Sequence, residues 1–265
     1  MNDTVLYDVA DGVATITLNR PKALNALNDE LREGLLDVTA RAETDDRARC
    51  VVVRGAGDSF MAGGDVKRFY EQRDADAFAT RRRFLEGINH IHPIGFALRR
   101  MAKPVLASVH GYAAGYGLSL ALACDLVISA DTAKYTLAYV RIGTSPDGSA
   151  SYTLPRAVGL KKAMEMALLG DDMDAATAQA HGLINFVVPQ AELGPETARL
   201  ARRLASGPTR AYANVKRLIW ASQDNGYESQ LQLEAECFAD NAVNGEFREG
   251  VAAFAEKRKP NFQGS

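Results

Sequence analysis

The spacing of hydrophobic residues changes from segment to segment in the first part of the chain. Residues 13–18 alternate between apolar and polar side chains, which predicts a strand. Residues 31–42 instead repeat apolar side chains at helical spacing, and Asn28 stands where it can cap this helix. Residues 50–53 form a β-branched run that is typical of a buried strand. The order strand, helix, strand predicts an α/β fold.

The middle of the chain continues this alternation. Residues 77–101 have a helical pattern, which we expect Pro93 to interrupt. A strand at residues 105–109 and an apolar helix at residues 118–124 follow. Further short strands are expected at residues 125–129, 134–137 and 185–188.

The last part of the chain is predicted to be helical, with the run at residues 185–188 as an exception. A segment such as residues 231–238, apolar at helical spacing, is expected to pack on the chain's own core or on a sister subunit. We therefore divide the chain into a core over residues 1–200 and a C-terminal helical region over residues 201–265.

Composition and charge favour an ordinary globular protein. The 265 residues are enough for one large α/β domain. A formal net charge of -2 gives no electrostatic reason to expect a nucleic acid partner. No segment has the length and hydrophobicity of a membrane span, and the N-terminus lacks signal-peptide features, so we expect a cytoplasmic protein without membrane contact. The chain has three cysteines, Cys50, Cys124 and Cys237. Their odd number and the lack of CxxC spacing predict reduced, packed thiols.

Two glycine-rich turns, at residues 59–65 and 110–117, carry the main chemical signal. Each follows a strand-like run and leads into a helix, so its backbone N–H groups lie at the positive end of a helix dipole. Together the turns could hold the oxyanion of an enolate or a tetrahedral intermediate, which predicts an acyl-handling enzyme. Alternatively, these glycines serve only tight turns or close packing. Neither G-x-G-x-x-G nor G-x-x-x-x-G-K-[ST] is present, so nicotinamide and nucleotide-hydrolase sites are not predicted.

The two turns belong to a longer series of motifs that covers nearly the whole chain. The other members are residues 19–27, 124–126, 142–152, 154–156, 180–184 and 254–258. In this order the series resembles the enoyl-CoA hydratase/isomerase superfamily, also called the crotonase superfamily. The resemblance implies an α/β fold with a crotonase-type ββα spiral core and a C-terminal helical region that builds homotrimers, often paired into hexamers.

The resemblance also implies a ligand, an acyl-CoA thioester, and no cofactor apart from the coenzyme A of that substrate. It assigns the N–H donors for the thioester oxygen to Gly64 and Tyr116, and each donor would supply roughly 3–4 kcal/mol. The run at residues 81–83 forms either a solvated face or a contact for a coenzyme A phosphate. Positions that resemble coenzyme A contacts are Lys22, Ala23, Leu24, Ala62, Gly64, Asp65, Val66, Phe254 and Lys257, the last two sometimes from a neighbouring subunit.

The resemblance separates this chain from the hydratases of the superfamily. Those enzymes carry two glutamates that activate water, whereas Ser119 and Tyr139 stand at the corresponding positions here. Asp147 aligns with the active carboxylate of one group of isomerases and of 4-chlorobenzoyl-CoA dehalogenase. We therefore predict an enoyl-CoA isomerase in which Asp147, with a pKa raised by burial, moves a proton from C2 to C4 of the acyl group.

The sequence leaves other roles open for these residues. Asp147 can cap a turn, or act as a nucleophile while His92 activates water, as the resemblance to the dehalogenase implies. Tyr139 either donates to Asp147, as the same resemblance implies, or lines the pocket. Residues 117–121 approximate the G-x-S-x-G pattern, in which Ser119 would be the nucleophile. In that case the enzyme would be a thioesterase. A hydratase with an atypical site and a non-catalytic CoA-binding scaffold are further alternatives. His90 and His92 would share a face only on a strand, so no metal site is predicted.

Overall fold

The computed structural model describes residues 3–74 and 76–262. Its main sheet has six strands in the order β1-β2-β3-β4-β6-β9. These strands are β1 (Val5–Ala10), β2 (Val13–Leu18), β3 (Cys50–Gly55), β4 (Val105–Val109), β6 (Leu126–Ala130) and β9 (Phe186–Val188). Neighbouring strands run parallel except β1 and β2, which form an antiparallel hairpin. The predicted α/β class is therefore confirmed.

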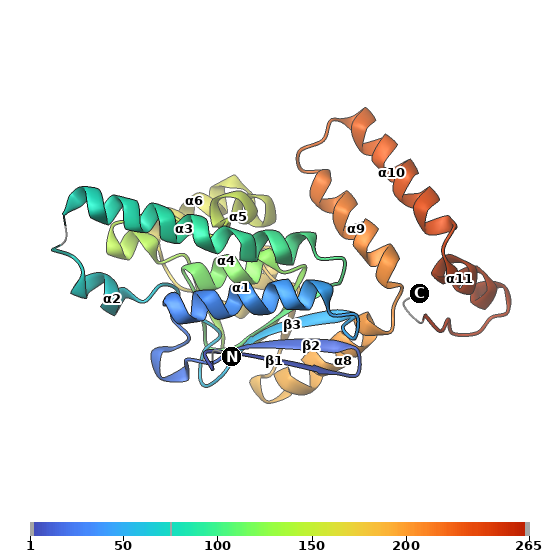
Figure 1. The fold of residues 1–265 in the computed structure, drawn as a ribbon, viewed down its shortest axis with the longest axis horizontal. Coiled ribbons are helices and arrows are strands. Elements are labelled where there is room, and N and C mark those ends of the chain that lie inside the picture. Colours follow the sequence, from blue (N-terminus) through green and yellow to red (C-terminus); the bar gives the residue numbers. More distant parts are fainter. Residues whose placement is uncertain (1–2, 75, 263–265) are drawn as a thin grey trace.

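The two faces of this sheet carry two separate hydrophobic cores, because side chains alternate along each strand. Val51 and Val53 of β3 point into the larger core, under α1 (Asp29–Thr44), α3 (Ala77–Arg100) and α4 (Tyr116–Ala123). Cys50 and Val52 point the other way, onto α8 (Leu193–Ala205). Figure 1 shows α1 and α3 on one side of the strands and α8 on the other. The packing on both faces supports β3 and β4, whose C-terminal ends lead into the two glycine-rich turns.

A small second sheet brings later parts of the chain against the ends of the main strands. It has the order β5-β7-β8, with β5 (Tyr112–Ala114), β7 (Lys134–Thr136) and β8 (Met173–Asp174). The remaining elements are η1 (Pro21–Ala23), α2 (Val66–Glu71), η2 (Tyr139–Ile142), α5 (Ala150–Val158), α6 (Leu160–Leu169), α7 (Ala175–Ala180), η3 (Gln190–Glu192), α9 (Thr209–Ala221), α10 (Tyr227–Ala242) and α11 (Gly245–Ala255).

Local signals in the sequence predicted most of these elements. The strands at residues 13–18 and 50–53 are confirmed, and Asn28 caps α1, with its Oδ1 accepting a hydrogen bond of 3.0 Å from the Leu31 amide. The interruption predicted at Pro93 is wrong, because α3 continues through it. Ile91 and Ile94, on either side of the proline, are buried in the core. The burial of these side chains offsets the one hydrogen bond that proline removes from the helix.

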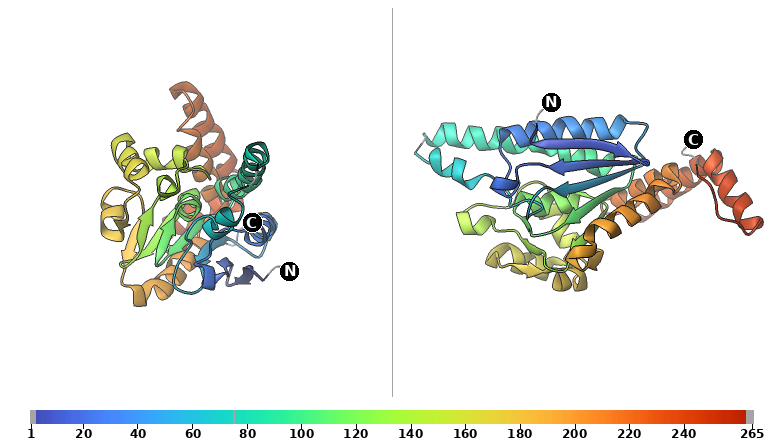
Figure 2. Two further views of the ribbon diagram at one scale, coloured as in Figure 1. Left: turned by 90° about the vertical axis from the view of Figure 1, so that its left-hand side faces the viewer. Right: turned by 90° about the horizontal axis from the view of Figure 1, so that it is seen from below.

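The C-terminal helices α9, α10 and α11 extend to one side of the sheet (Figures 1 and 2). They are tied to the core by Lys216 of α9, whose Nζ lies 2.7 Å from a carboxylate oxygen of Asp125. The predicted boundary at residue 200 falls inside α8, because Ala201 and Ala205 of that helix pack on the sheet. The structure therefore places the start of the C-terminal helical region after α8.

The three cysteines are free and buried, as predicted. Within the described ranges, none of the helices combines the length and the hydrophobicity that a bilayer span requires. The same ranges contain no group of three or more His, Cys, Asp or Glu side chains arranged to hold a metal ion.

Candidate active site

The two glycine-rich turns, far apart in the sequence, lie against each other in the structure. The Met61 amide donates to the Tyr112 carbonyl at 2.9 Å, and the Ala114 amide donates to the Met61 carbonyl at 2.9 Å. A third bond of 2.8 Å joins the Phe60 amide to the His110 carbonyl. These bonds place the end of the first turn beside the start of α4, as the prediction of one shared site requires.

Glycines allow the close approach of the two turns. Gly63 and Gly115 have φ angles of +94° and +52°, which L side chains rarely adopt. A Cβ atom on Gly63 would lie 3.5 Å from the Gly115 Cα atom, and one on Gly117 would lie 2.2 Å from the Met61 carbonyl oxygen. The glycines therefore serve close packing and the shape of the site at once.

This contact predicts a large cost for Gly117→Ala. The new methyl group would push Met61 and its turn away from α4, so the free energy of unfolding should fall by about 3 kcal/mol. Chemical denaturation of both proteins measures the loss. Gly95→Ala in α3 is the matched control, because a Cβ atom there meets nothing within 4 Å; it should be neutral or slightly stabilising. Equal denaturation midpoints for the two variants would contradict the proposed packing.

Two backbone N–H groups are available where the turns meet. A parallel bridge joins Leu27 to Gly64, but its bonds use the Gly63 carbonyl and the Asp65 amide, at 2.7 and 3.1 Å. Tyr116 is the first residue of α4, where amide groups have no partner within the helix. Among the hydrogen bonds of the described residues, neither the Gly64 nor the Tyr116 N–H is a donor. Both residues line one cavity, so they can donate to a ligand there.

Asn25 supports the first turn, a role that sequence reasoning missed. Its side chain is fully buried, and its Nδ2 donates to the Ser59 and Ala56 carbonyls at 2.8 and 3.0 Å. Its Oδ1 accepts from the Arg20 amide at 2.8 Å. Asn25 lies within the motif at residues 19–27, but the identity of its partners depends on the packing of that motif against the end of β3.

The cavity that contains both donors has a volume of about 1080 Å³. Its walls come from the first turn, from the N-terminal end of α4, from η2 and the loop before α5, and from α1, α2 and α3. Asp147, Tyr139 and His92 line it together. The structure therefore brings the predicted carboxylate and the predicted oxyanion donors into one space.

Asp147 is held at the wall of the cavity by its neighbours. Its Oδ1 accepts a hydrogen bond of 2.6 Å from the Tyr139 hydroxyl. Burial raises the pKa of Asp147 above its usual value, although the hydrogen bond from Tyr139 and the charge of His92 partly oppose this. The cap alternative is not favoured, because α5 begins after Ser149 without a side-chain cap. A carboxylate in this environment is suited to accept and return a proton.

Ser119 lies behind this carboxylate and does not line the cavity. It is fully buried, and its Oγ donates to the Asp147 carbonyl at 2.9 Å and lies 3.4 Å from the Tyr139 hydroxyl. These contacts hold the backbone of the turn that carries Asp147. The position does not suit a thioesterase nucleophile, which must reach the substrate.

The two histidines of α3 have different surroundings. His92 faces the cavity close enough to Asp147 to lower the pKa of that carboxyl. His90 also lines the cavity, but its Nε2 lies 3.2 Å from a carboxylate oxygen of Glu33 of α1. Residues 90 and 92 are both on the helix α3, as the sequence pattern predicted for this segment.

The residues that resemble coenzyme A contacts fall into four groups. Ala62, Gly64 and Val66 line the cavity. Asp65 does not, because its carboxylate pairs with Arg20 at 3.2 Å and caps α2. Lys22 and Ala23 lie in η1, and Leu24 follows it beside the first glycine-rich turn, where its carbonyl accepts from the Ala62 amide at 3.0 Å. These three residues lie outside the cavity wall.

Phe254 and Lys257 are not brought to the cavity of their own chain. They lie at the end of α11, on the opposite side of the molecule from α2 (Figure 1). The Phe254 side chain is 88% exposed. Within their own chain, the two residues therefore take no part in the cavity wall.

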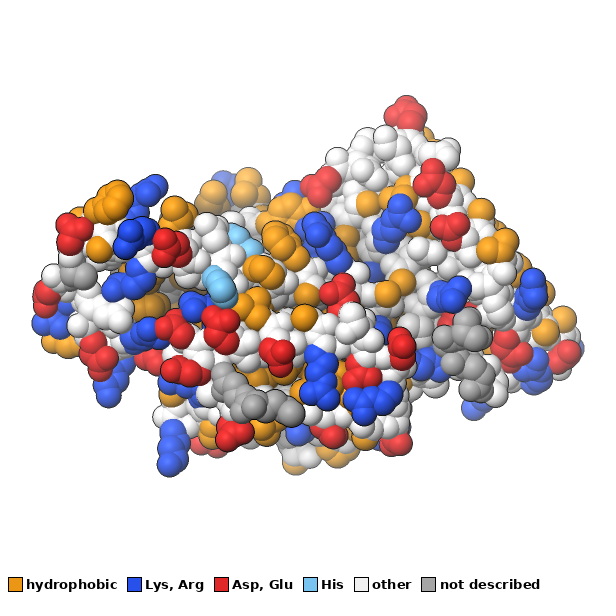
Figure 3. Space-filling view, viewed as in Figure 1, with side chains coloured by type: hydrophobic (Ala, Val, Ile, Leu, Met, Phe, Trp, Pro, Cys, Tyr) orange, Lys and Arg blue, Asp and Glu red, His pale blue; other side chains and the backbone are white. Residues whose placement is uncertain are grey.

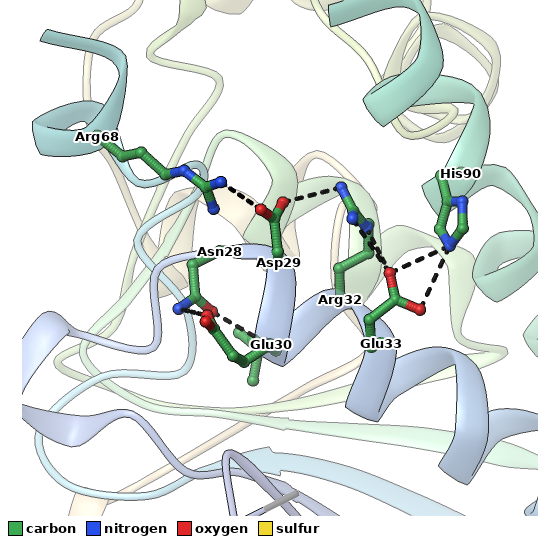
Figure 4. Close-up of polar contacts among 8 residues, drawn as sticks. Asn28, Asp29, Glu30, Arg32, Glu33, Arg68 and His90 are labelled. Atoms are coloured by element: carbon green, nitrogen blue, oxygen red, sulfur yellow. Dashed lines mark hydrogen bonds and ion pairs between the residues drawn. The ribbon is translucent and has the colours of Figure 1, made fainter. Parts of the chain in front are cut away.

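A charged network on the cavity wall was not anticipated. Figure 4 shows Asp29 of α1 between two arginines, Arg68 of α2 and Arg32 of α1. Arg32 also pairs with Glu33 at 3.1 Å, and Glu33 in turn contacts His90 of α3. The spacing of charges within α1 is readable from the sequence, but the contacts to α2 and α3 depend on how the three helices pack.

Comparisons with known proteins agree with this geometry. The profile of a family described as Enoyl-CoA hydratase/isomerase matches residues 8–265. The chain is 37% identical over 265 residues to 1,2-epoxyphenylacetyl-CoA isomerase of Escherichia coli, covering 100% of both chains. It is 34% identical over 260 residues to trans-2-decenoyl-[acyl-carrier-protein] isomerase of Streptococcus mutans, covering 98% of each. Among solved structures, an enoyl-CoA hydratase from a Polaromonas species superposes with a TM-score of 0.91 at 32% identity, with 98% of this chain and 99% of that chain covered.

Proposed function

Because the chain belongs to the enoyl-CoA hydratase/isomerase family of the crotonase superfamily, we propose that it is an acyl-CoA isomerase that uses Asp147 as both base and acid. The observation that carries this proposal is one desolvated carboxylate in the same cavity as two open N–H donors, Gly64 and Tyr116. A hydratase of this family uses two glutamates, and Ser119 and Tyr139 occupy those positions here. A single carboxylate is enough to move a proton.

The mechanism follows from the placement of these groups. The thioester oxygen of a 3-enoyl-CoA accepts hydrogen bonds from the Gly64 and Tyr116 amides. Asp147 removes a proton from C2, and the negative charge spreads over a dienolate whose oxygen the two donors stabilise. The protonated Asp147 then returns the proton at C4, which leaves the double bond between C2 and C3. Tyr139 donates to Oδ1 and so leaves the other carboxylate oxygen free for the transfer.

The names of two relatives support isomerisation over hydration. The Escherichia coli relative is named an isomerase of 1,2-epoxyphenylacetyl-CoA, and the Streptococcus mutans relative an isomerase of trans-2-decenoyl-[acyl-carrier-protein]. Other relatives are named hydratases, so the names alone do not decide the reaction. The side chains at positions 119 and 139 favour the isomerase.

Parallel assays of 3-octenoyl-CoA, 2-octenoyl-CoA and 4-chlorobenzoyl-CoA test the proposed reaction. We expect rapid conversion of the 3-enoyl to the 2-enoyl thioester and little turnover of the other two. Fast hydration of 2-octenoyl-CoA would make the enzyme an atypical hydratase instead. Dehalogenation that is lost in His92→Gln would favour the nucleophilic role of Asp147. Thioester hydrolysis that Ser119→Ala abolishes would favour a thioesterase, and binding without turnover would favour a scaffold.

The hydrogen bond from Tyr139 predicts the pH dependence of the reaction. Asp147 must be ionised to accept a proton, so kcat/KM should rise as the pH passes through its pKa. Tyr139→Phe removes a contact that lowers this pKa, so the acid limb of the profile should move to higher pH. Profiles of kcat/KM against pH measure the shift. Tyr152→Phe, whose hydroxyl contacts Asp224 outside the cavity, is the control and should leave the limb in place. If the acid limb of Tyr139→Phe stayed at the wild-type pH, a group other than Asp147 would control it.

We also propose that the C-terminal helices mediate self-association into a trimer or hexamer. Phe238 and Val243, at the end of α10, are 70% and 75% exposed, and Phe254 of α11 is more exposed still. Large apolar side chains gathered on neighbouring helices are typical of an interface between subunits. Such contacts would also allow Phe254 and Lys257 to approach a ligand bound to a neighbouring copy.

A further inference from the structure

The cavity extends along α3 well beyond the reacting groups. His92, near Asp147, and Arg83 both line it, and they are nine residues apart on the same helix. At 1.5 Å per residue this separation is about 13 Å along the helix axis. An acyl group that starts at the oxyanion donors and follows α3 therefore leads toward Arg83.

Arg83 presents a positive charge at this end of the cavity. Its guanidinium carbon lies 5.0 Å from the ring centroid of Phe84, which also lines the cavity and packs edge-on against Phe69. No ion pair joins Arg83 to a carboxylate within residues 3–74 and 76–262. The Arg83 residue is half-buried, and its planar fork of N–H donors is available for a ligand.

The surrounding wall does not neutralise this charge. Arg32 and Arg68 also line the cavity, and they share one lining carboxylate, Asp29 (Figure 4). The other lining acid at this end, Glu86, lies 3.9 Å from Arg82, which is outside the cavity. Figure 3 shows Lys and Arg side chains, interspersed with acidic ones, gathered over α2 and the first half of α3. The net charge of the cavity wall around Arg83, called the distal wall below, is therefore positive.

A plain hydrocarbon chain fits this wall poorly. An alkyl end would remove water from the guanidinium group of Arg83 without replacing its hydrogen bonds, which costs free energy. A carboxylate would accept two parallel hydrogen bonds from the same group and satisfy its charge. The residues nearer to Asp147, such as Ile91 and Leu137, are apolar and suit the methylene part of such a chain.

We propose that Arg83 binds a carboxylate at the far end of the acyl group, so that the preferred substrates are monothioesters of medium-length dicarboxylic acids. This inference rests on the proposed function, because it requires that the cavity binds an acyl-CoA. It adds the class of acyl group, which neither the oxyanion donors nor Asp147 determines.

Calorimetric binding of two saturated thioesters tests this assignment without any turnover. Octanedioyl-CoA should bind the wild-type enzyme more tightly than octanoyl-CoA does. Arg83→Met keeps the aliphatic stem and removes the charge, so it should weaken octanedioyl-CoA binding by about 10- to 100-fold and octanoyl-CoA binding far less. Arg82→Met is the matched control, because this neighbour is exposed and lies outside the cavity, and it should change neither affinity.

Two results would overturn the inference. Equal loss for both thioesters in Arg83→Met would assign this arginine to a coenzyme A phosphate, which the two ligands share. Equal affinities of the wild-type enzyme for the two thioesters would show that the distal wall does not select a carboxylate. Because saturated thioesters cannot isomerise, these outcomes are independent of the 3-octenoyl-CoA assay, and failure of one proposal is distinguishable from failure of the other.

Discussion

Asp147→Asn should lower kcat for the isomerisation of 3-octenoyl-CoA by about 10²- to 10⁴-fold. The amide has nearly the shape of the carboxylate and can still accept a hydrogen bond from Tyr139, but it cannot take a proton from C2. The oxyanion donors, the backbone amides of Gly64 and Tyr116, are unchanged in the variant. Binding of the substrate should therefore be retained, and the loss should appear in kcat and not in KM.

Steady-state kinetics of the purified variant measures this loss, with circular dichroism to confirm that it is folded. Asp37→Asn, on the exposed face of α1, is the matched control and should retain full activity. If Asp147→Asn isomerised 3-octenoyl-CoA at the wild-type rate, the base would have to be another group, and His92 would be the next candidate in the same cavity.

Lys216→Met should lower the free energy of unfolding by about 3–5 kcal/mol. The Lys216 side chain is 10% exposed and that of Asp125 is 15% exposed, and the Lys216 Nζ also donates to the Leu98 and Lys103 carbonyls at 3.1 and 2.9 Å. Methionine has a similar volume, but it leaves a buried carboxylate without its cation. The pair joins α9 to the core, so the whole C-terminal region should lose its anchor.

The pH dependence of this loss has a definite sign. Burial already raises the pKa of Asp125, and the Lys216 charge opposes that rise. In the variant the pKa of Asp125 should rise further, so protonation at low pH relieves the unpaired charge. The loss measured by chemical denaturation should thus be larger at pH 7 than at pH 5. Lys162→Met, which breaks a more exposed pair with Glu165, is the control and should cost below about 1 kcal/mol. A similarly small loss in Lys216→Met would contradict the anchoring role.

Local patterns predicted the interior strands of the fold because these strands are buried and β-branched. The edge strand β1 was missed, since Leu6 is 47% exposed and breaks the alternation of apolar and polar side chains. A usable signal was present, however. Asp11 and Gly12, with φ angles of +52° and +75°, form the two-residue turn between β1 and β2. An Asp-Gly pair before a strand is a strong indication of a hairpin.

The candidate site was predicted from motifs whose chemistry depends on residue type, such as the glycines and Asp147. The residues that position or extend the site could not be found in the same way. Asn25 supports the first turn through carbonyl groups about thirty residues later in the chain. The pairing of Asp29 with Arg68 depends on how α1 and α2 pack. Arg83 was noted only as part of an arginine run, because the sequence does not show which face of α3 turns toward the cavity.

Proton exchange at the two carbons of the substrate tests the central role of Asp147 most directly. In D₂O, 3-octenoyl-CoA would be followed by NMR for deuterium at C2 of the substrate and at C4 of the product, with the wild-type enzyme and with Asp147→Asn. A single carboxylate that returns the proton it removes predicts that the wild-type product carries the substrate's own hydrogen at C4 with little deuterium, and that product formation falls sharply in the variant. Full deuteration at C4 in the wild-type product, or wild-type rates in Asp147→Asn, would contradict the account.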